Sequence, residues 1–214
     1  MIIRRFSILA ILVSLVSVSA SAQSVVPIKT GDKLRYESLR FDARGSEIFI
    51  AATTPLTAEI AVSPEGRAIT YSSRRVDKFN ADHALVERIS ADGKAQDWTG
   101  KRLLSWLPKD RNSRAKFETG SSFPPNFCGE VDAMYTATPT DVTYKIAISG
   151  NEVTVKAVQY LLEGRWRGTC GSGKQVVRFV YSPELDAILE SEILNYHPSS
   201  FLNVGSGLRL KSVN

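Results

Sequence analysis

The chain has 214 residues, of which 43% are hydrophobic and 23% charged, and its formal net charge is +5 at pH 7. This length suits one ordinary globular domain, and the apolar content is too high for a disordered chain. A protein with several membrane spans would contain longer apolar runs, so that class is excluded as well.

Residues 1–22 have the three parts of a secretory signal peptide. Met1–Arg5 is short and cationic, Phe6–Val18 is apolar, and Ala20–Ala22 forms a small-x-small cleavage site. The apolar stretch is shorter than the ~20 residues of a membrane span, and no cysteine follows it that could carry a lipid anchor. We therefore expect a periplasmic or secreted domain of residues 23–214, with no membrane span after signal cleavage.

Beyond the signal peptide, hydrophobic residues alternate with polar ones at a period of two, the pattern of half-buried β-strands. Turn residues at 64–66, 91–94 and 149–151 connect some of these runs as hairpins. This pattern predicts about ten strands in a mainly antiparallel sheet. The runs are Lys33–Phe41, Glu47–Ala52, Leu56–Ser63, Arg67–Ser73, Leu85–Ser90, Val142–Ile148, Val153–Leu162, Gln175–Tyr181, Ala187–Leu194 and Leu208–Val213.

The apolar phase changes within Val153–Leu162, from Val153 and Val155 to Val158 and Tyr160. Such a change indicates a β-bulge that bends a long strand. The predicted fold class is therefore all-β, a strongly curved sheet or incomplete β-barrel with little helix. A single domain with two sub-sheets is favoured over two separate domains, which would each be small.

Residues 101–127 interrupt the alternation. Lys101–Leu107 fits a helical turn or a short strand, and Pro108 ends either one. The segment Thr119–Phe127 contains one glycine, one serine pair and Pro124-Pro125, so the sequence predicts an irregular 109–127 loop, the kind of loop that often forms a binding rim.

The mature chain contains two cysteines, Cys128 and Cys170. Two cysteines in an oxidising compartment allow a single pairing, so a structural disulfide between them is predicted. No Cys-x-x-Cys pair is present, and His83 and His197 are too few to complete a zinc site. We expect no metal and no cofactor.

Signal-peptide cleavage removes two arginines and no acidic residue, which leaves a formal charge of +3. The basic residues are dispersed over Arg74-Arg75, 109–116 and Arg165 with Arg167 rather than concentrated. A nucleic-acid partner is therefore not expected, because such proteins carry a dense basic face. Weak attraction to anionic lipids or polymers of the envelope stays open.

Catalytic motifs are scarce. The sequence contains no Gly-x-Ser-x-Gly elbow and no phosphate-binding loop, and its two histidines allow few catalytic triads. Glu190 and Glu192 would share one strand face and could in principle perform acid-base chemistry, but an exposed strand face is the preferred interpretation. No catalytic residue is assigned, and we expect a protein that is not an enzyme.

The aromatic residues offer a candidate binding site. Arg165-Trp166-Arg167 places an indole between two guanidinium groups, which suits an acidic amphiphile, although a surface strand would look the same. If aromatic residues line the concave side of a curved sheet, they form a pocket for a lipid or another apolar ligand. The candidate ligand-binding residues are Tyr160, Arg165, Trp166, Arg167, Trp106 and Phe127.

The segment Val180–Leu185, with its Tyr-Ser-Pro-Glu sequence, resembles the C-terminal hairpin of uncharacterised bacterial exported β-proteins, and Gly31–Tyr36 is similar to how such domains open. The resemblance covers about the last 60 residues and implies a turn at Pro183, without a catalytic residue. More distantly, the predicted curved sheet is similar to the half-barrel carriers of lipoproteins, an analogy of fold only.

Three hypotheses follow. The leading one is a non-enzymatic periplasmic protein that binds an apolar or amphiphilic ligand or otherwise serves envelope maintenance. The second is an interaction module that docks an envelope protein through a sheet edge or the 109–127 loop. The third, an enzyme using Glu190, Glu192 or His197, ranks last.

Overall fold

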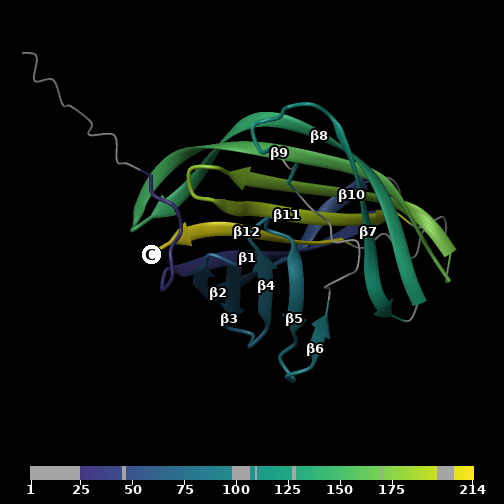
Figure 1. The fold of residues 1–214 in the computed structure, drawn as a ribbon, viewed down its shortest axis with the longest axis horizontal. Coiled ribbons are helices and arrows are strands. Elements are labelled where there is room, and N and C mark those ends of the chain that lie inside the picture. Colours follow the sequence, from purple (N-terminus) through teal and green to yellow (C-terminus); the bar gives the residue numbers. More distant parts are fainter. Residues whose placement is uncertain are drawn as a thin grey trace, which may run out of the picture.

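The computed structural model describes residues 25–44, 47–97, 107–108, 110–126, 129–169, 171–196 and 205–214. Twelve strands form one continuous sheet in the order β6-β5-β4-β3-β2-β1-β12-β11-β10-β9-β8-β7 (Figure 1). Their bounds are β1 Lys33–Arg44, β2 Glu47–Ser63, β3 Gly66–Tyr71, β4 Val76–Asn80, β5 Leu85–Ile89, β6 Ala95–Asp97, β7 Phe117–Asn126, β8 Gly129–Ile148, β9 Asn151–Gly168, β10 Gly171–Ser182, β11 Ala187–Tyr196 and β12 Gly205–Val213.

The sheet is strongly curved and antiparallel, as predicted from the alternation. Its one parallel contact joins the end of β8 to the end of β12, where Ser212 pairs with Ala147 and Val213 with Ile148. This contact closes strands β8 to β12 into a partial ring at one end of the curved sheet. The expectation of two sub-sheets is wrong, because the neighbouring pair β1 and β12 joins the two halves of a single sheet.

Two predicted strands, 47–52 and 56–63, are one strand, β2. Pro55 lies within it, opposite Glu37 of β1, whereas β3 pairs with β2 only from Ala58 onward. Proline has no backbone N–H, and it is tolerated here because β2 has no neighbour on its other side at that point.

The prediction of an irregular loop at 109–127 is wrong for most of its length, since residues 117–126 form β7. β7 is an edge strand that pairs with β8 alone. The register shifts between Phe123 and Asn126, so the ladder skips Pro124 and Pro125. A proline pair can therefore stay in this strand, because an edge position demands no backbone donor from it.

The predicted bulge in 153–162 is also wrong, because β9 pairs with β8 and with β10 in unbroken register. The phase change has another cause: β9 buries one face in its first half and the opposite face in its second half. Val155 and Ala157 belong to one hydrophobic cluster, whereas Val158, Tyr160 and Leu162 belong to another. Successive side chains of a strand point to opposite faces, so the two clusters lie on opposite sides of β9.

The two clusters together form the core. The first contains side chains from β1, β2, β3 and β8 to β12. Ile28, which precedes β1, also belongs to it and donates its backbone N–H to the carbonyl of Leu185 at 3.0 Å. The second lies on β8, β9 and β10 and is covered by Leu107 and Phe117. Among the described residues there is no helix with the length and apolar composition that a membrane crossing requires.

Candidate functional site

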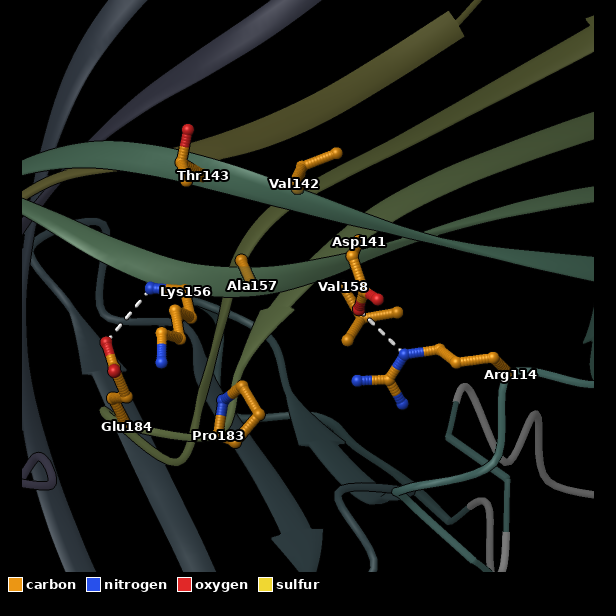
Figure 2. Close-up of a pocket in the computed structure, with 9 residues that line it drawn as sticks. All are labelled: Arg114, Asp141, Val142, Thr143, Lys156, Ala157, Val158, Pro183 and Glu184. Carbon is orange, nitrogen blue, oxygen red and sulfur yellow. Dashed lines mark hydrogen bonds and ion pairs between the residues drawn. The ribbon is translucent and has the colours of Figure 1, made fainter.

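An open groove of about 860 Å³ lies between three elements that are distant in the sequence (Figure 2). β8 and β9 form one wall, the turn between β10 and β11 forms the second, and the segment before β7 contributes Arg114. We call this the Lys156 groove. Its lining residues are Arg114, Asp141, Val142, Thr143, Lys156, Ala157, Val158, Pro183 and Glu184.

The groove forms where β9 changes the face that it buries. Ala157 is the last residue of β9 in the first cluster and Val158 is the first in the second, and both line the groove. Val158 and Pro183 make its floor apolar, whereas Val142 and Ala157 face the first cluster. The groove therefore lies at the boundary between the two hydrophobic clusters.

The turn wall is attached to β9 by its own polar groups. The Ser182 hydroxyl donates to the carbonyl of Lys156 at 3.0 Å and accepts the backbone N–H of Leu185 at 3.3 Å. A Glu184 Oε2 atom accepts the backbone N–H of Lys156 at 2.9 Å. The Ser-Pro-Glu sequence noted above thus forms a turn that is fixed against the middle of β9.

The two ends of the groove differ in whether their charged side chains form an ion pair. At one end the Arg114 Nε donates to Asp141 Oδ1 at 2.7 Å, so these two charges compensate each other. At the other end the Lys156 ammonium group makes no ion pair with any described residue, and Glu184 binds a backbone group rather than a cation. Figure 2 shows the Lys156 side chain extending toward the side of the groove where Glu184 and Pro183 lie.

Beside the groove, the carboxylate of Asp186 joins four separate elements. It accepts hydrogen bonds from His83 Nε2 at 2.9 Å, Tyr181 Oη at 2.7 Å and Arg67 at 2.7 Å. Arg111 approaches the same carboxylate at 3.4 Å and donates to the Tyr181 hydroxyl at 3.1 Å. A carboxylate only accepts hydrogen bonds, so Nε2 of His83 carries the proton.

The electrostatics of this cluster favour a charged aspartate and a neutral histidine. Burial alone would raise the pKa of Asp186, but the hydrogen bonds from His83, Tyr181 and Arg67 outweigh it and hold the pKa well below its usual range. Burial lowers the pKa of His83, and the hydrogen bond to Asp186 offsets this only in part. The cluster thus anchors β3, the β4–β5 turn and the segment before β7 to the turn that walls the groove.

The glutamate pair is not an exposed strand face, which corrects the preferred interpretation of these residues. Glu190 and Glu192 are only 5% and 7% exposed. Arg178 binds both of them, at 2.7 Å and 2.8 Å, and Arg209 binds Glu190 at 2.9 Å. Burial raises the pKa of Glu192, whereas for Glu190 the contacts with Arg209 and Arg178 outweigh burial and lower the pKa.

The described residues of the predicted ligand site divide between the two faces of β9. Tyr160 is a fully buried core residue, stacked on Phe179 with ring centroids 4.8 Å apart. On β9, Arg165 and Arg167 are exposed, and alternation places Trp166 on the opposite face, packed against the second cluster. Trp106 and Phe127 lie outside the described residues.

The predicted disulfide concerns Cys128 and Cys170, which also lie outside the described residues, as does His197. The strands that flank the two cysteines are neighbours, with Asp132 of β8 paired to Arg167 of β9. The disulfide therefore stays a prediction. No group of histidine, cysteine, aspartate and glutamate side chains suited to a metal ion occurs in the part of the chain that the structure describes.

Comparison with known proteins gives only distant similarities. No family model matches the chain, and no curated protein matches it. A presumed lipoprotein from Parabacteroides distasonis ATCC 8503 is similar at 9% identity, over 90% of this chain and 99% of that one, with a TM-score of 0.41. A presumed exported protein with a YmcC-like fold from Bacteroides fragilis NCTC 9343 is similar at 13% identity, over 89% and 98%, with a TM-score of 0.32.

Proposed function

We propose that this chain is a non-enzymatic protein of the cell envelope that binds an amphiphilic ligand in the Lys156 groove. The observation that carries the proposal is the groove itself, about 860 Å³ with an apolar floor between charged ends. This size lies within the range of about 300–1,000 Å³ typical of small-molecule sites. An apolar floor with a few polar groups at its margin suits a molecule that has an apolar part and a polar part.

A wholly apolar ligand fits the structure less well. The hollow lined by Ile28, Leu34, Tyr36 and other core residues offers only about 40 Å³, little more than room for one water molecule. The ring closed by β8 and β12 is filled by its own side chains, including the fully buried Val155, Leu189 and Leu210. The open groove is thus the better place for a ligand, and an open site favours an amphiphile whose polar part stays in water.

The non-enzymatic part of the proposal is supported by the state of the acidic residues. Glu190 and Glu192 are held by two arginines, and the Asp186 carboxylate is held by four donors. A general acid or base needs a proton-accepting oxygen that a substrate can reach. These carboxylates instead have the surroundings of structural ion pairs.

The test is native mass spectrometry of the protein exported to the periplasm and purified without detergent. The wild type is expected to carry a discrete small-molecule adduct that organic extraction removes. Thr143 is an exposed residue of β8 that lines the groove, so Thr143→Trp fills the site and should lose most of the adduct. Thr136→Trp, an equally exposed threonine of β8 outside the groove, should keep it. A bare mass for the wild type, or equal adducts in both variants, would contradict the proposal.

A second candidate function is docking of another envelope protein at the edge of the sheet. One observation favours it: the 109–127 segment contains β7, and β7 is one of the two edge strands of the sheet, so the two elements predicted for docking coincide there. An edge strand leaves backbone N–H and C=O groups available for a partner strand. In the same mass spectra, a stoichiometric adduct of protein mass would favour this function over the first.

A further inference from the structure

The two ends of the Lys156 groove differ in their charges, and this difference indicates the charge of the ligand's polar head. The inference rests on the proposed function. Arg114 and Asp141 are paired with each other at 2.7 Å, so neither presents a full charge to a ligand. At the other end, Lys156 presents an ammonium group without an ion-pair partner among the described residues. Glu184 presents a carboxylate that, among the described residues, accepts a hydrogen bond from the Lys156 backbone N–H and makes no ion pair.

This end therefore offers one positive and one negative group side by side. Both belong to the groove wall, and Lys156 is exposed while Glu184 is half-buried. A purely anionic head would pair with Lys156 but would be repelled by Glu184. A purely cationic head would pair with Glu184 but would be repelled by Lys156. A head that carries both charges can satisfy both residues.

We propose that the ligand's polar head is a zwitterion with a primary ammonium group, bound with its anionic part at Lys156 and its ammonium group at Glu184. Phosphoethanolamine has this chemistry, with a phosphate and an ammonium group separated by two carbon atoms. The apolar part then lies along Val158 and Pro183. The same chemistry could arrive as a phospholipid or as the water-soluble headgroup alone.

Calorimetric titration of the mature wild-type chain with four soluble probes tests the proposal. The probes are dihexanoyl phosphatidylethanolamine, phosphatidylglycerol and phosphatidylcholine below their micelle concentrations, and glycerophosphoethanolamine, which has no acyl chains. The ethanolamine lipid is expected to bind about fivefold more tightly than the glycerol and choline lipids, the effect of one exposed charged contact. Glycerophosphoethanolamine should bind more weakly than the ethanolamine lipid, because it lacks the apolar part.

Two neutralising substitutions separate the charges. Glu184→Gln keeps an oxygen for the Lys156 backbone N–H and should weaken the ethanolamine lipid about fivefold while leaving the glycerol lipid unchanged or tighter. Lys156→Gln should weaken both lipids. Glu163→Gln removes an exposed carboxylate of β9, paired with Lys174 outside the groove, and should change neither.

The outcomes distinguish this inference from the proposed function. Equal binding of all three lipids, unchanged by Glu184→Gln, would overturn the zwitterion and leave the amphiphile groove intact. Equal binding of glycerophosphoethanolamine and its lipid would support the zwitterion and contradict the amphiphile. Binding of no probe, with an adduct of the native protein that Thr143→Trp still removes, would overturn the zwitterion alone.

Discussion

Replacing Tyr160 with alanine is expected to lower the free energy of unfolding by about 3–5 kcal/mol, the usual cost of deleting a large buried aromatic side chain. Tyr160 has no exposed surface, stacks on Phe179 and meets the edge of Phe117 at 6.2 Å between ring centroids. The side chain lies on β9 between β8 and β10, so a cavity there affects the centre of the second cluster.

Tyr160→Phe should not lower the free energy of unfolding. The Tyr160 hydroxyl is buried and has no hydrogen-bond partner in the described structure, and a buried unpaired polar group is destabilising. Its removal should leave the free energy of unfolding unchanged or raise it by up to about 1 kcal/mol. Urea denaturation followed by circular dichroism measures both variants.

Tyr135→Phe is the matched control, because this tyrosine belongs to the same cluster but its hydroxyl donates to Gln175. That substitution leaves a buried acceptor unpaired and should destabilise the protein by about 1–2 kcal/mol. Equal destabilisation by the two phenylalanine substitutions would show that the Tyr160 hydroxyl has a partner, and would contradict its assignment as an unpaired core group.

Replacing Asp186 with asparagine should lower the free energy of unfolding at pH 7 by about 2–4 kcal/mol, a range that allows for the partial solvent exposure of this carboxylate. Asparagine keeps the shape but loses the charge that holds Arg67, His83 and Arg111. The turn between β10 and β11 would keep the hydrogen bond from Arg67 to the backbone carbonyl of residue 186, but it would lose the ion pair with Arg67 of β3. Glu152→Gln, in the exposed Lys145–Glu152 pair, is the control and should cost at most about 0.5 kcal/mol.

The effect of Asp186→Asn depends on pH in a direction that follows from the pKa of Asp186. The folded state holds this pKa below its value of about 3.9 in the unfolded chain. The stabilisation is therefore complete above about pH 5 and is lost as the pH falls below 4, where the unfolded chain takes up the proton first. The wild type and Asp186→Asn should converge in stability toward pH 2, and a constant difference between pH 7 and pH 2 would contradict the role of the charged Asp186.

Protonation of His83 also lowers the free energy of unfolding as the pH falls, at a higher pH than the protonation of Asp186. Its pKa is lowered in the folded state, so protonation favours the unfolded chain as the pH falls through about 6.5. Acid should therefore loosen the Asp186 cluster in two stages, first at the histidine and then at the aspartate.

The strands and the curved antiparallel sheet could be predicted because alternation reports which side chains each strand buries. The loop predicted at 109–127 and the division of β2 into two strands are wrong for the same reason, since alternation says nothing about the neighbours of a strand. β7 contains Pro124 and Pro125 because it is an edge strand, and Pro55 lies within β2 because that stretch has one neighbour only. The phase change in β9 was visible in the sequence, but its cause, burial on opposite faces, appears only when both clusters are present.

The candidate site was much harder to predict. Lys156, Glu184 and Arg114 come from three elements, and no local pattern indicates that they meet. The Tyr-Ser-Pro-Glu sequence did mark the turn that forms one wall of the groove, and the turn's role emerged only from its hydrogen bonds to β9. Its aromatic side chain makes Tyr160 a candidate for a ligand site in the sequence, whereas its neighbours on both adjacent strands make it a core residue.

The most direct test of the groove as the ligand site is an NMR titration of the isotope-labelled mature chain with dihexanoyl phosphatidylethanolamine. We predict that backbone amide signals shift for residues 141–143, 156–158 and 184, and that those of residues 165–167 stay in place. Shifts confined to residues 165–167 or to β7, with the groove unchanged, would contradict it.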